Sequence, residues 1–165
     1  MPRVWVSVGT NQDRDNSVRN AIAAMRAEFG ELVISPVYET VAVGFEGDPF
    51  LNLVVGFHTG QSPAVLHATL RGIEAANGRR RDGEKFGDRS LDLDLLTWGD
   101  VVTDEGGRHL PRDEITRYAF VLRPLADVAG DEVHPETGAT YAQLWQAMAL
   151  GQAAGMRLYP FDAGA

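Results

Sequence analysis

The sequence contains no cysteine, and this absence excludes disulfide bonds, cysteine-ligated zinc and thiol catalysis. It also lacks any apolar run near the roughly 20 residues that a membrane-spanning helix needs. The N-terminal residues MPRVWVSV do not contain the apolar stretch and small-residue cleavage site of a signal peptide. We therefore expect a cytoplasmic protein that has no membrane partner.

Basic residues are scarce as well. Fifteen Lys and Arg stand against 23 Asp and Glu, which gives a formal net charge of −8. Because binding to a nucleic-acid backbone depends on a basic surface, we expect no nucleic-acid partner. Five of the fifteen basic residues nevertheless lie within positions 79–89, and such a cluster can attract a small anion. An arginine run by itself is more often a solvated loop.

The length and composition of the chain indicate one domain. At 165 residues, with 44% hydrophobic side chains, the chain can bury one core and is too short to need two domains. We expect this domain to span residues 1–161, with residues 162–165 as a frayed C-terminal tail.

Apolar periodicity predicts the order of the elements. Strands are expected at 3–8, 32–40, 50–59, 91–95 and 156–161, with a possible short strand at 101–103 and a long loop at 41–49. Helices are expected at 15–29 and 63–77, from 113 to a limit set by Pro124, and from a capping box at 140–143 to Gly151. This order is typical of an α+β, ferredoxin-like single domain, in which an antiparallel-rich sheet flanked by helices carries its two long helices on one face.

Three local signals refine these boundaries. Asp15 or Asn16 is expected to cap the first helix, and Ser62 is expected to cap the second. Pro36 favours an edge position or a bulge within the second strand.

The four histidines show no metal-ligand spacing and are expected at the surface or in caps.

The most informative stretch is 79–100, where a basic, glycine-containing loop runs into the alternation Leu91-Asp92-Leu93-Asp94-Leu95. Side chains alternate between the faces of a strand at about 3.3 Å per residue, so Asp92 and Asp94 share one face roughly 6.6 Å apart. Hard divalent cations prefer oxygen ligands, and guanidinium groups suit phosphate. The alternation alone is more often an ordinary strand, but beside the basic loop we hypothesise a metal-nucleotide site.

Three further residues stand out. In the strand expected at 50–59, Phe50 and Asn52 share the face opposite to the apolar one, where a polar side chain can face a pocket. Glu74 lies in the last turn of its helix, where an acid opposes the macrodipole. Its position indicates a further partner, and pairing with an arginine and binding of a ligand remain open.

Several motifs resemble one known family. The run Phe86-Gly87-x-Arg89-x-Leu91-Asp92-Leu93-Asp94-Leu95-Leu96 is similar to the signature of the 6-hydroxymethyl-7,8-dihydropterin pyrophosphokinases. The resemblance extends to Gly9-Thr10-Asn11, Pro49-Phe50-Leu51-Asn52, Ile73-Glu74, Gly78-Arg79-x-Arg81 and Ala119-Phe120-Val121-Leu122-x-Pro124-Leu125, and is weak over the last thirty or so residues.

The resemblance implies an enzyme of folate biosynthesis that transfers pyrophosphate from ATP to the hydroxymethyl group of 6-hydroxymethyl-7,8-dihydropterin and releases AMP. It implies that Asp92 and Asp94 hold two Mg²⁺ ions and that the protein is a monomer. The residues implied at the pterin are Thr40, Val43, Phe50, Asn52 and Phe120. Those implied at ATP are Glu74, Arg79, Leu95, Arg108, His109 and Arg112, and those implied in catalysis are Arg81, Lys85 and Arg89.

Some positions depart from the commoner family pattern. Lys85 stands where arginine is frequent, Asp88 where proline is usual, and Tyr118 where arginine is frequent. These departures leave open a second interpretation, a catalytically weak or inactive homologue that acts as a nucleotide- or pterin-binding module. A ferredoxin-like RNA binder is a third interpretation, which the acidic charge balance disfavours.

Overall fold

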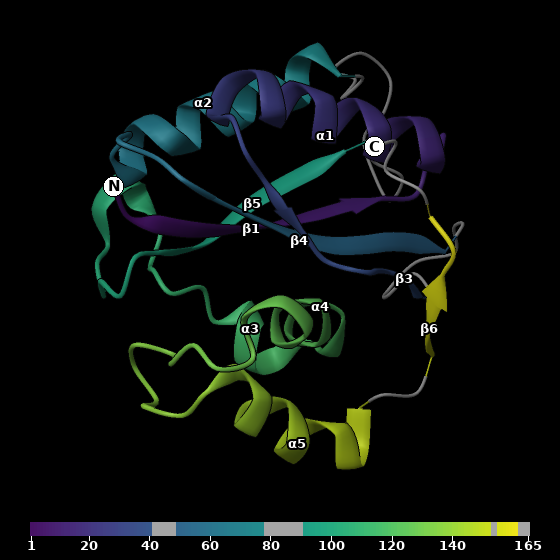
Figure 1. Ribbon diagram of the computed structural model, residues 1–165, viewed down its shortest axis with the longest axis vertical. Helices are drawn as coiled ribbons and strands as arrows, with labels where there is room; N and C mark the ends of the chain where they lie inside the picture. Colours follow the sequence, from purple (N-terminus) through teal and green to yellow (C-terminus); the bar gives the residue numbers. More distant parts are fainter. Residues whose placement is uncertain (41–48, 78–90, 153–154, 162–165) are drawn as a thin grey trace.

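The computed structural model describes residues 1–40, 49–77, 91–152 and 155–161, which form a three-layer α+β fold (Figure 1). One antiparallel sheet lies at its centre with the strand order β5-β1-β4-β3-β6, and β2 also pairs with β4. The strands are β1 (Arg3–Thr10), β2 (Val33–Ile34), β3 (Val37–Thr40), β4 (Phe50–His58), β5 (Asp92–Trp98) and β6 (Met156–Tyr159). The order β5-β1-β4-β3 is the ferredoxin-like arrangement, so the expected fold class is confirmed.

Helices cover both faces of the sheet. They are α1 (Arg14–Phe29), α2 (Pro63–Ala76), the 3-10 helix η1 (Glu105–Gly107), α3 (Glu114–Arg117), α4 (Ala119–Ala129) and α5 (Tyr141–Gln152). The long helices α1 and α2 lie side by side on one face, whereas α3, α4 and α5 lie on the other (Figure 1). The expectation that the two long helices share one face is therefore confirmed.

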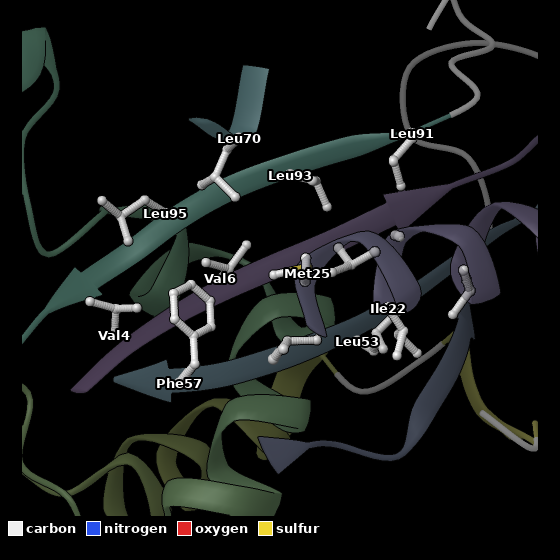
Figure 2. Packing of buried hydrophobic residues seen from close by; sticks show 14 of the residues in the cluster. Val4, Val6, Ile22, Met25, Leu53, Phe57, Leu70, Leu91, Leu93 and Leu95 are labelled. Atoms are coloured by element: carbon white, nitrogen blue, oxygen red, sulfur yellow. The ribbon is translucent and has the colours of Figure 1, made fainter. Parts of the chain in front are cut away.

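The larger core lies between the sheet and helices α1 and α2 (Figure 2). Alternate residues of β1, β4 and β5 enter it, together with Leu91 just before β5. From the strands these are Val4, Val6, Val8, Leu51, Leu53, Val55, Phe57, Leu93 and Leu95. Burying one side chain of this size stabilises the fold by about 1.5–3 kcal/mol. Because side chains alternate along a strand, this core fixes which residues face the α4 side.

A second core lies between the opposite face of the sheet and helices α4 and α5. The sheet contributes Trp5, Val54 and Leu96, and Leu122 of α4 packs against them. Trp5 also donates a hydrogen bond from Nε1 to Glu132 Oε1 at 3.0 Å. The sheet is thus covered on both faces, and a site on the α4 side has to lie where α4 leaves the strand ends uncovered.

Two of the expected boundaries in the N-terminal half need correction. The first helix is preceded by Asp13 in the left-handed conformation, and the Ser17 N–H donates to the Asp13 carbonyl at 2.8 Å, so Asp15 and Asn16 lie inside the helix. The strand expected at 32–40 divides into β2 and β3 at Pro36. There the Ser35 hydroxyl accepts the Val54 N–H at 2.8 Å and replaces part of the regular ladder.

The helix expected after Asp113 is two helices, because Tyr118 is extended (φ −120°, ψ 126°) between α3 and α4. The prediction that Pro124 limits this helix is wrong, since α4 continues to Ala129. Pro124 cannot donate to the carbonyl one turn earlier, but Leu122 and Leu125 are fully buried beside it. Their packing outweighs one missing hydrogen bond.

Two of the predicted caps are confirmed. Ser62 accepts the Val65 N–H at 3.3 Å, and the Thr140 and Gln143 side chains each accept the other's backbone N–H, at 3.1 and 2.9 Å. The last helix does not stop at Gly151 but continues to Gln152. The strand considered at 101–103 reduces to one bridge between residues 103 and 110.

Within the described ranges, we find no helix that is both long enough and apolar enough to cross a membrane. The loop expected at 41–49 falls largely outside those ranges, and the tail expected at 162–165 falls outside them entirely.

The contact between Gly56 and Trp5 gives a test of the sheet packing. A Cβ atom added at Gly56 would come within 2.3 Å of the Trp5 ring, so either the ring or β4 would have to move. We expect Gly56→Ala to lower the free energy of unfolding by about 1–3 kcal/mol, measured by urea denaturation followed by circular dichroism. Gly72→Ala is the matched control. Nothing lies within 4 Å of its added Cβ inside α2, and alanine there should raise stability by about 0.5–1 kcal/mol. Equal effects of the two changes would contradict the packing described.

Candidate active site

A pocket of about 380 Å³ lies on the α4 side of the sheet. Four strands, the two helices α3 and α4, and the residue between these helices contribute to its walls. The lining residues are Ser7, Val8, Gly9, Thr40, Phe50, Asn52, Leu53, Asp92, Asp94, Leu96, Glu114, Tyr118, Phe120 and Val121.

The floor of the pocket is a row across three neighbouring strands. Gly9 of β1 is the cross-strand partner of Asn52 on β4 and of Asp92 on β5. At the usual strand spacing this places the outer two backbones roughly 10 Å apart. Gly9 has no side chain to fill the space between them, and a Cβ there would come 3.3 Å from Asn52 Oδ1. The Asn52 amide and the Asp92 carboxylate therefore lie at the two ends of this row, and the strand between them contributes no side chain at Gly9.

One half of the pocket is aromatic and amide-lined. Thr40, Phe50, Asn52 and Phe120, four of the five residues expected at a pterin, all line it, and Val43 lies outside the described residues. Asn52 donates from Nδ2 to Thr40 Oγ1 at 2.8 Å, which fixes the orientation of its amide. Chemically, this half suits a flat heterocycle with polar edges.

The other half carries the two carboxylates predicted from the alternation of β5. Asp92 and Asp94 both line the pocket, and 34% of the Asp94 side chain is exposed. Arg71 Nη2 lies 3.5 Å and Arg108 Nη1 3.4 Å from Asp94 Oδ1. These guanidinium groups offset part of the negative charge and are near enough to meet an anion that binds there.

These carboxylates fit a hard divalent cation that is only partly held by protein. In the part of the chain that the structure describes, no group of three or more His, Cys, Asp or Glu side chains is arranged to hold a metal ion. Mg²⁺ commonly binds through one or two carboxylates and takes its other oxygens from water and substrate phosphates. The donor set at Asp92 and Asp94 is therefore suited to a magnesium ion that binds together with a nucleotide.

Helix α2 holds the edge strand that carries both aspartates. Glu74, only 1% exposed, accepts the Leu93 N–H through Oε2 at 2.7 Å. Arg71 donates to the Leu93 carbonyl, and its Nε lies 3.3 Å from Glu74 Oε1. Leu93 stands between Asp92 and Asp94, so this pair fixes their positions. Of the two roles left open for Glu74, the structure shows the arginine pairing, and its contact with ATP stays a prediction.

Three further residues expected at ATP have different surroundings. The Leu95 side chain is fully enclosed in the larger core, so only its backbone is left to contact a nucleotide. His109 is held between Asp104 at 2.8 Å and Glu136 at 3.0 Å, and these two hydrogen bonds raise its pKa. Arg108 reaches Asp94, as described above. The ATP contacts of all three remain predictions.

Arg112 and His67 lie near the arginines of the site but differ in charge. Arg112 donates its backbone N–H to the Leu96 carbonyl at 2.9 Å, and its side chain pairs with Glu114 at 2.7 Å. His67 of α2 is half-buried rather than at the surface or in a cap as expected, and its Nε2 has no hydrogen-bond partner in the described residues. Burial, followed by the nearby Arg108, lowers the pKa of His67. His67 is therefore neutral at pH 7, and the positive charge there belongs to arginines.

Several lining residues were not found from the sequence. Glu114 and Ser7 have no local signal, because distant strands and helices bring them to the pocket. Arg71, which contacts Asp94 without lining the pocket, had a local signal, since it precedes Glu74 by three residues and such pairs meet on a helix. The basic residues expected to contact phosphate lie outside the described residues: Arg79, Arg81, Lys85 and Arg89.

A ferredoxin-like α+β sheet whose edge brings an aromatic pocket to paired carboxylates is suited to an enzyme that binds a flat heterocycle beside an anion. The family model for 7,8-dihydro-6-hydroxymethylpterin-pyrophosphokinase matches residues 5–130. The 2-amino-4-hydroxy-6-hydroxymethyldihydropteridine pyrophosphokinase of Pseudomonas aeruginosa is 35% identical over 133 residues, covering 78% of this chain and 82% of that one. The protein of the same name from Synechocystis is 36% identical over 131 residues, covering 78% and 67%. The chain therefore belongs to the 7,8-dihydro-6-hydroxymethylpterin-pyrophosphokinase family.

This finding confirms the family and the enzyme class that the sequence motifs indicated. Other relatives are longer. The folic acid synthesis protein fol1 of Pneumocystis carinii is 32% identical over 146 residues, which cover 87% of this chain and 20% of that protein. A crystal structure of Plasmodium falciparum HPPK-DHPS has a TM-score of 0.75 at 13% identity and supports the fold alone. The match covers 96% of this chain and 47% of that one.

The Glu74 contact yields a test that separates support of the strand from contact with ATP. We expect Glu74→Ala to lower the free energy of unfolding by about 1–3 kcal/mol, because it leaves the buried Leu93 N–H without this acceptor. Glu74→Gln keeps an acceptor oxygen at the same reach and should recover most of the loss. Urea denaturation measures both variants. Unchanged stability of Glu74→Ala, with weakened ATP binding alone, would show that the side chain serves the nucleotide and not the strand.

Proposed function

We propose that this protein transfers the pyrophosphoryl group of ATP to the hydroxymethyl group of 6-hydroxymethyl-7,8-dihydropterin, releasing AMP, as a step of folate biosynthesis. The observation that carries the proposal is one pocket that Phe50, Asn52 and Phe120 line together with Asp92 and Asp94. The bacterial relatives are named as pyrophosphokinases of that dihydropteridine. The chain spans about a fifth of the Pneumocystis protein and about half of the Plasmodium chain, so the proposal concerns this reaction alone.

The aromatic half is proposed to bind the pterin. Phe50 and Phe120 supply ring faces, and offset stacking of aromatic rings adds about 0.5–1.5 kcal/mol beyond the buried area. The hydrogen bond from Asn52 to Thr40 holds one amide proton, so the rest of the Asn52 amide is oriented for the polar edge of the ring. Val43 is proposed to complete the contacts of that edge.

Asp92 and Asp94 are proposed to hold magnesium, with two ions as the expected number. When bound, magnesium neutralises phosphate charge and helps to align the triphosphate. The chain's own contribution is to keep both carboxylates on one face. It does so through the packing of Leu93 into the core, the hydrogen bond that the Leu93 N–H donates to Glu74, and the one that Arg71 donates to the Leu93 carbonyl. Positioning of this kind supplies most of the rate in phosphoryl-type transfer.

In the proposed reaction the pterin hydroxymethyl oxygen attacks the β-phosphorus of ATP. A new P–O bond forms, the bond from the β-phosphorus to the oxygen bridging to the α-phosphorus breaks, AMP leaves with that oxygen, and the hydroxyl proton is released. Arg81, Lys85 and Arg89 are proposed to stabilise the developing charge. The residues proposed to bind ATP are Glu74, Arg79, Leu95, Arg108, His109 and Arg112.

A monomer in the cytoplasm is part of the proposal. The second candidate function, a binding module without turnover, rests on Tyr118, which lines the pocket where the family frequently has an arginine. Its ring stacks on Phe120 with 5.1 Å between the ring centroids. A stacked tyrosine supports pterin binding in both candidates, so only turnover separates them.

Turnover is tested by AMP release from ATP, Mg²⁺ and hydroxymethyl-dihydropterin. We expect activity in the unmodified protein and a loss of about 100-fold or more in Asp92→Ala and in Asp94→Ala, because each removes an oxygen ligand of the cation. Asp100→Ala, an exposed aspartate in the turn after β5, is the matched control. Pterin binding without AMP release would favour the binding module. Full turnover by both pocket variants would rule out the carboxylate site.

The pterin half is tested separately through Phe120. We expect Phe120→Leu to raise the KM for the pterin roughly three- to tenfold, because leucine keeps apolar volume but loses ring stacking. The KM for ATP should stay within about twofold. Steady-state kinetics with each substrate varied in turn give both constants. Equal increases in the two KM values would place Phe120 outside a pterin-specific wall.

A further inference from the structure

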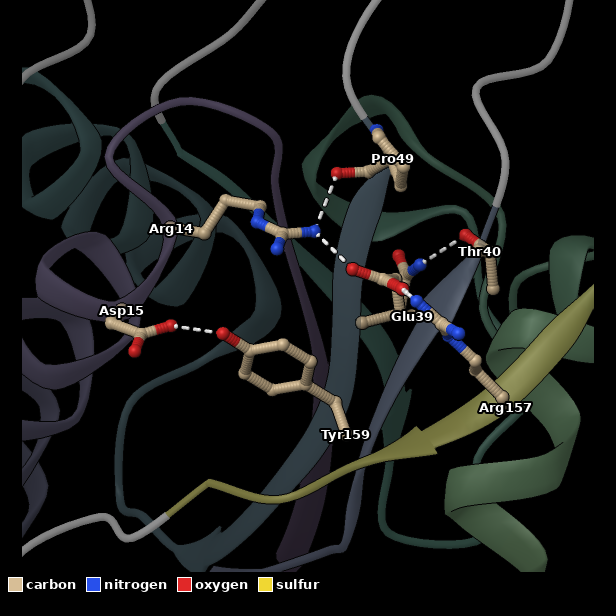
Figure 3. A network of polar contacts seen from close by, with 8 residues as sticks. Arg14, Asp15, Glu39, Thr40, Pro49, Arg157 and Tyr159 are labelled. Atoms are coloured by element: carbon tan, nitrogen blue, oxygen red, sulfur yellow. Dashed lines mark hydrogen bonds and ion pairs between the residues drawn. The ribbon is translucent and has the colours of Figure 1, made fainter.

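The pocket residues Thr40 and Phe50 lie at the ends of two paired strands. Thr40 is the last residue of β3, Phe50 is the first residue of β4, and the two are cross-strand partners. Both line the aromatic half of the pocket. Their separation therefore depends on whatever holds these two strand ends together, and a group of charged side chains lies beside them (Figure 3).

Glu39 is the centre of this group. Its side chain is 10% exposed, and both carboxylate oxygens are engaged. Oε2 accepts a hydrogen bond from Arg14 Nη1 at 2.7 Å, and Oε1 accepts one from Arg157 Nε at 2.8 Å (Figure 3). The hydrogen bond from Arg14, followed by that from Arg157, holds the pKa of this carboxyl below its ordinary value, so it is ionised at neutral pH.

Arg14 joins the two strand ends directly. Its Nη1 donates to the Glu39 carboxylate and also to the Pro49 carbonyl at 3.1 Å (Figure 3). Glu39 immediately precedes Thr40, and Pro49 immediately precedes Phe50. Arg14 is also the first residue of α1, where a cation opposes the helix macrodipole. Its placement is unfavourable for the helix and is explained by the two acceptors that it bridges.

The C-terminal strand supports the same group. β6 pairs with β3 in a register that sets Arg157 opposite Glu39. Tyr159 donates to Asp15 Oδ1 at 2.9 Å, which ties β6 to the start of α1, and the Arg14 guanidinium lies 5.2 Å from the Tyr159 ring (Figure 3). These residues of β6 lie beyond the 5–130 range that the family model matches. A part of the chain outside that range thus contacts the support of the pocket.

We propose that Arg14 is a positioning residue for the pterin half of the pocket, and that β6 completes its support through Arg157. The inference rests on the proposed function, because it assigns the aromatic half to the pterin. Arg14 is absent from the pocket lining and acts through Glu39 and Pro49. Through these contacts it sets the distance between Thr40 and Phe50. It therefore affects how well the pterin ring fits, and it does not affect the binding of ATP.

The test is the KM for each substrate in Arg14→Met and Arg14→Lys. We expect Arg14→Met to raise the KM for hydroxymethyl-dihydropterin roughly three- to tenfold, with the KM for ATP within about twofold. Arg14→Lys should give an intermediate value, because an ammonium can reach the carboxylate but lacks the guanidinium fork. Arg26→Met, an exposed arginine in the last turn of α1, is the matched control and should change neither constant.

A direct binding measurement accompanies the kinetics. Fluorescence titration of the same pterin, with Mg²⁺ and a non-hydrolysable ATP analogue present, should show the same increase in Kd for Arg14→Met. Thermal unfolding verifies that each variant is folded at the assay temperature. If Arg14→Met does not fold, Arg157→Met removes the other Glu39 partner and should raise the pterin KM about twofold to threefold.

The outcomes separate this inference from the proposed function. Folded variants with an unchanged pterin KM, or with equal increases for both substrates, would overturn the positioning role and leave the transfer activity standing. If the unmodified protein binds pterin without releasing AMP, the transfer proposal fails, and the titration still decides the role of Arg14. If the unmodified protein does not bind pterin, both are overturned.

Discussion

The buried hydrogen bond from the Leu93 N–H to the Glu74 carboxylate is the interaction on which the site depends. β5 is an edge strand, and the outer backbone groups of an edge strand have no neighbouring strand to pair with. Helix α2 provides the partner instead, through Glu74 and Arg71. With β5 held in this register, Leu93 enters the core, and Asp92 and Asp94 must face the pocket. A slip of one residue would bury both carboxylates.

The two halves of the pocket are supported from different parts of the chain. The carboxylate half depends on α2, which is the neighbour of β5 in sequence as well as in space. The aromatic half depends on Glu39, whose partners Arg14 and Arg157 come from near the two ends of the chain. Between the halves lies Gly9, which contributes backbone without a side chain. Each half can therefore be weakened by a substitution that leaves the other half intact.

The sequence predicted what alternation and local caps determine. Side chains alternate along a strand, and this rule places Asp92 and Asp94 on one face of β5. The same rule sends Leu51 and Leu53, on either side of Asn52 in β4, into the core. It did not predict what distant segments decide. Nothing near Pro124 shows that core packing will carry α4 past it, and nothing near Glu114 shows that it will line the pocket. The contacts of Arg79–Arg89 remain predictions from the family resemblance.

The junction between α3 and α4 shows how this chain distributes charge around the pocket. Tyr118 stands where the family frequently has an arginine, and it contributes an aromatic wall. Its neighbour Arg117 is exposed, with its guanidinium 6.0 Å from the Tyr118 ring. Among the described residues, the cations that pair with Asp94 come instead from Arg71 and Arg108. Because neutralisation of an anion depends on distance and not on which element carries the cation, these arginines can supply the charge that a tyrosine cannot. In the proposed function, the aromatic requirement of the pterin and the ionic requirement of ATP therefore fall on different walls of the pocket.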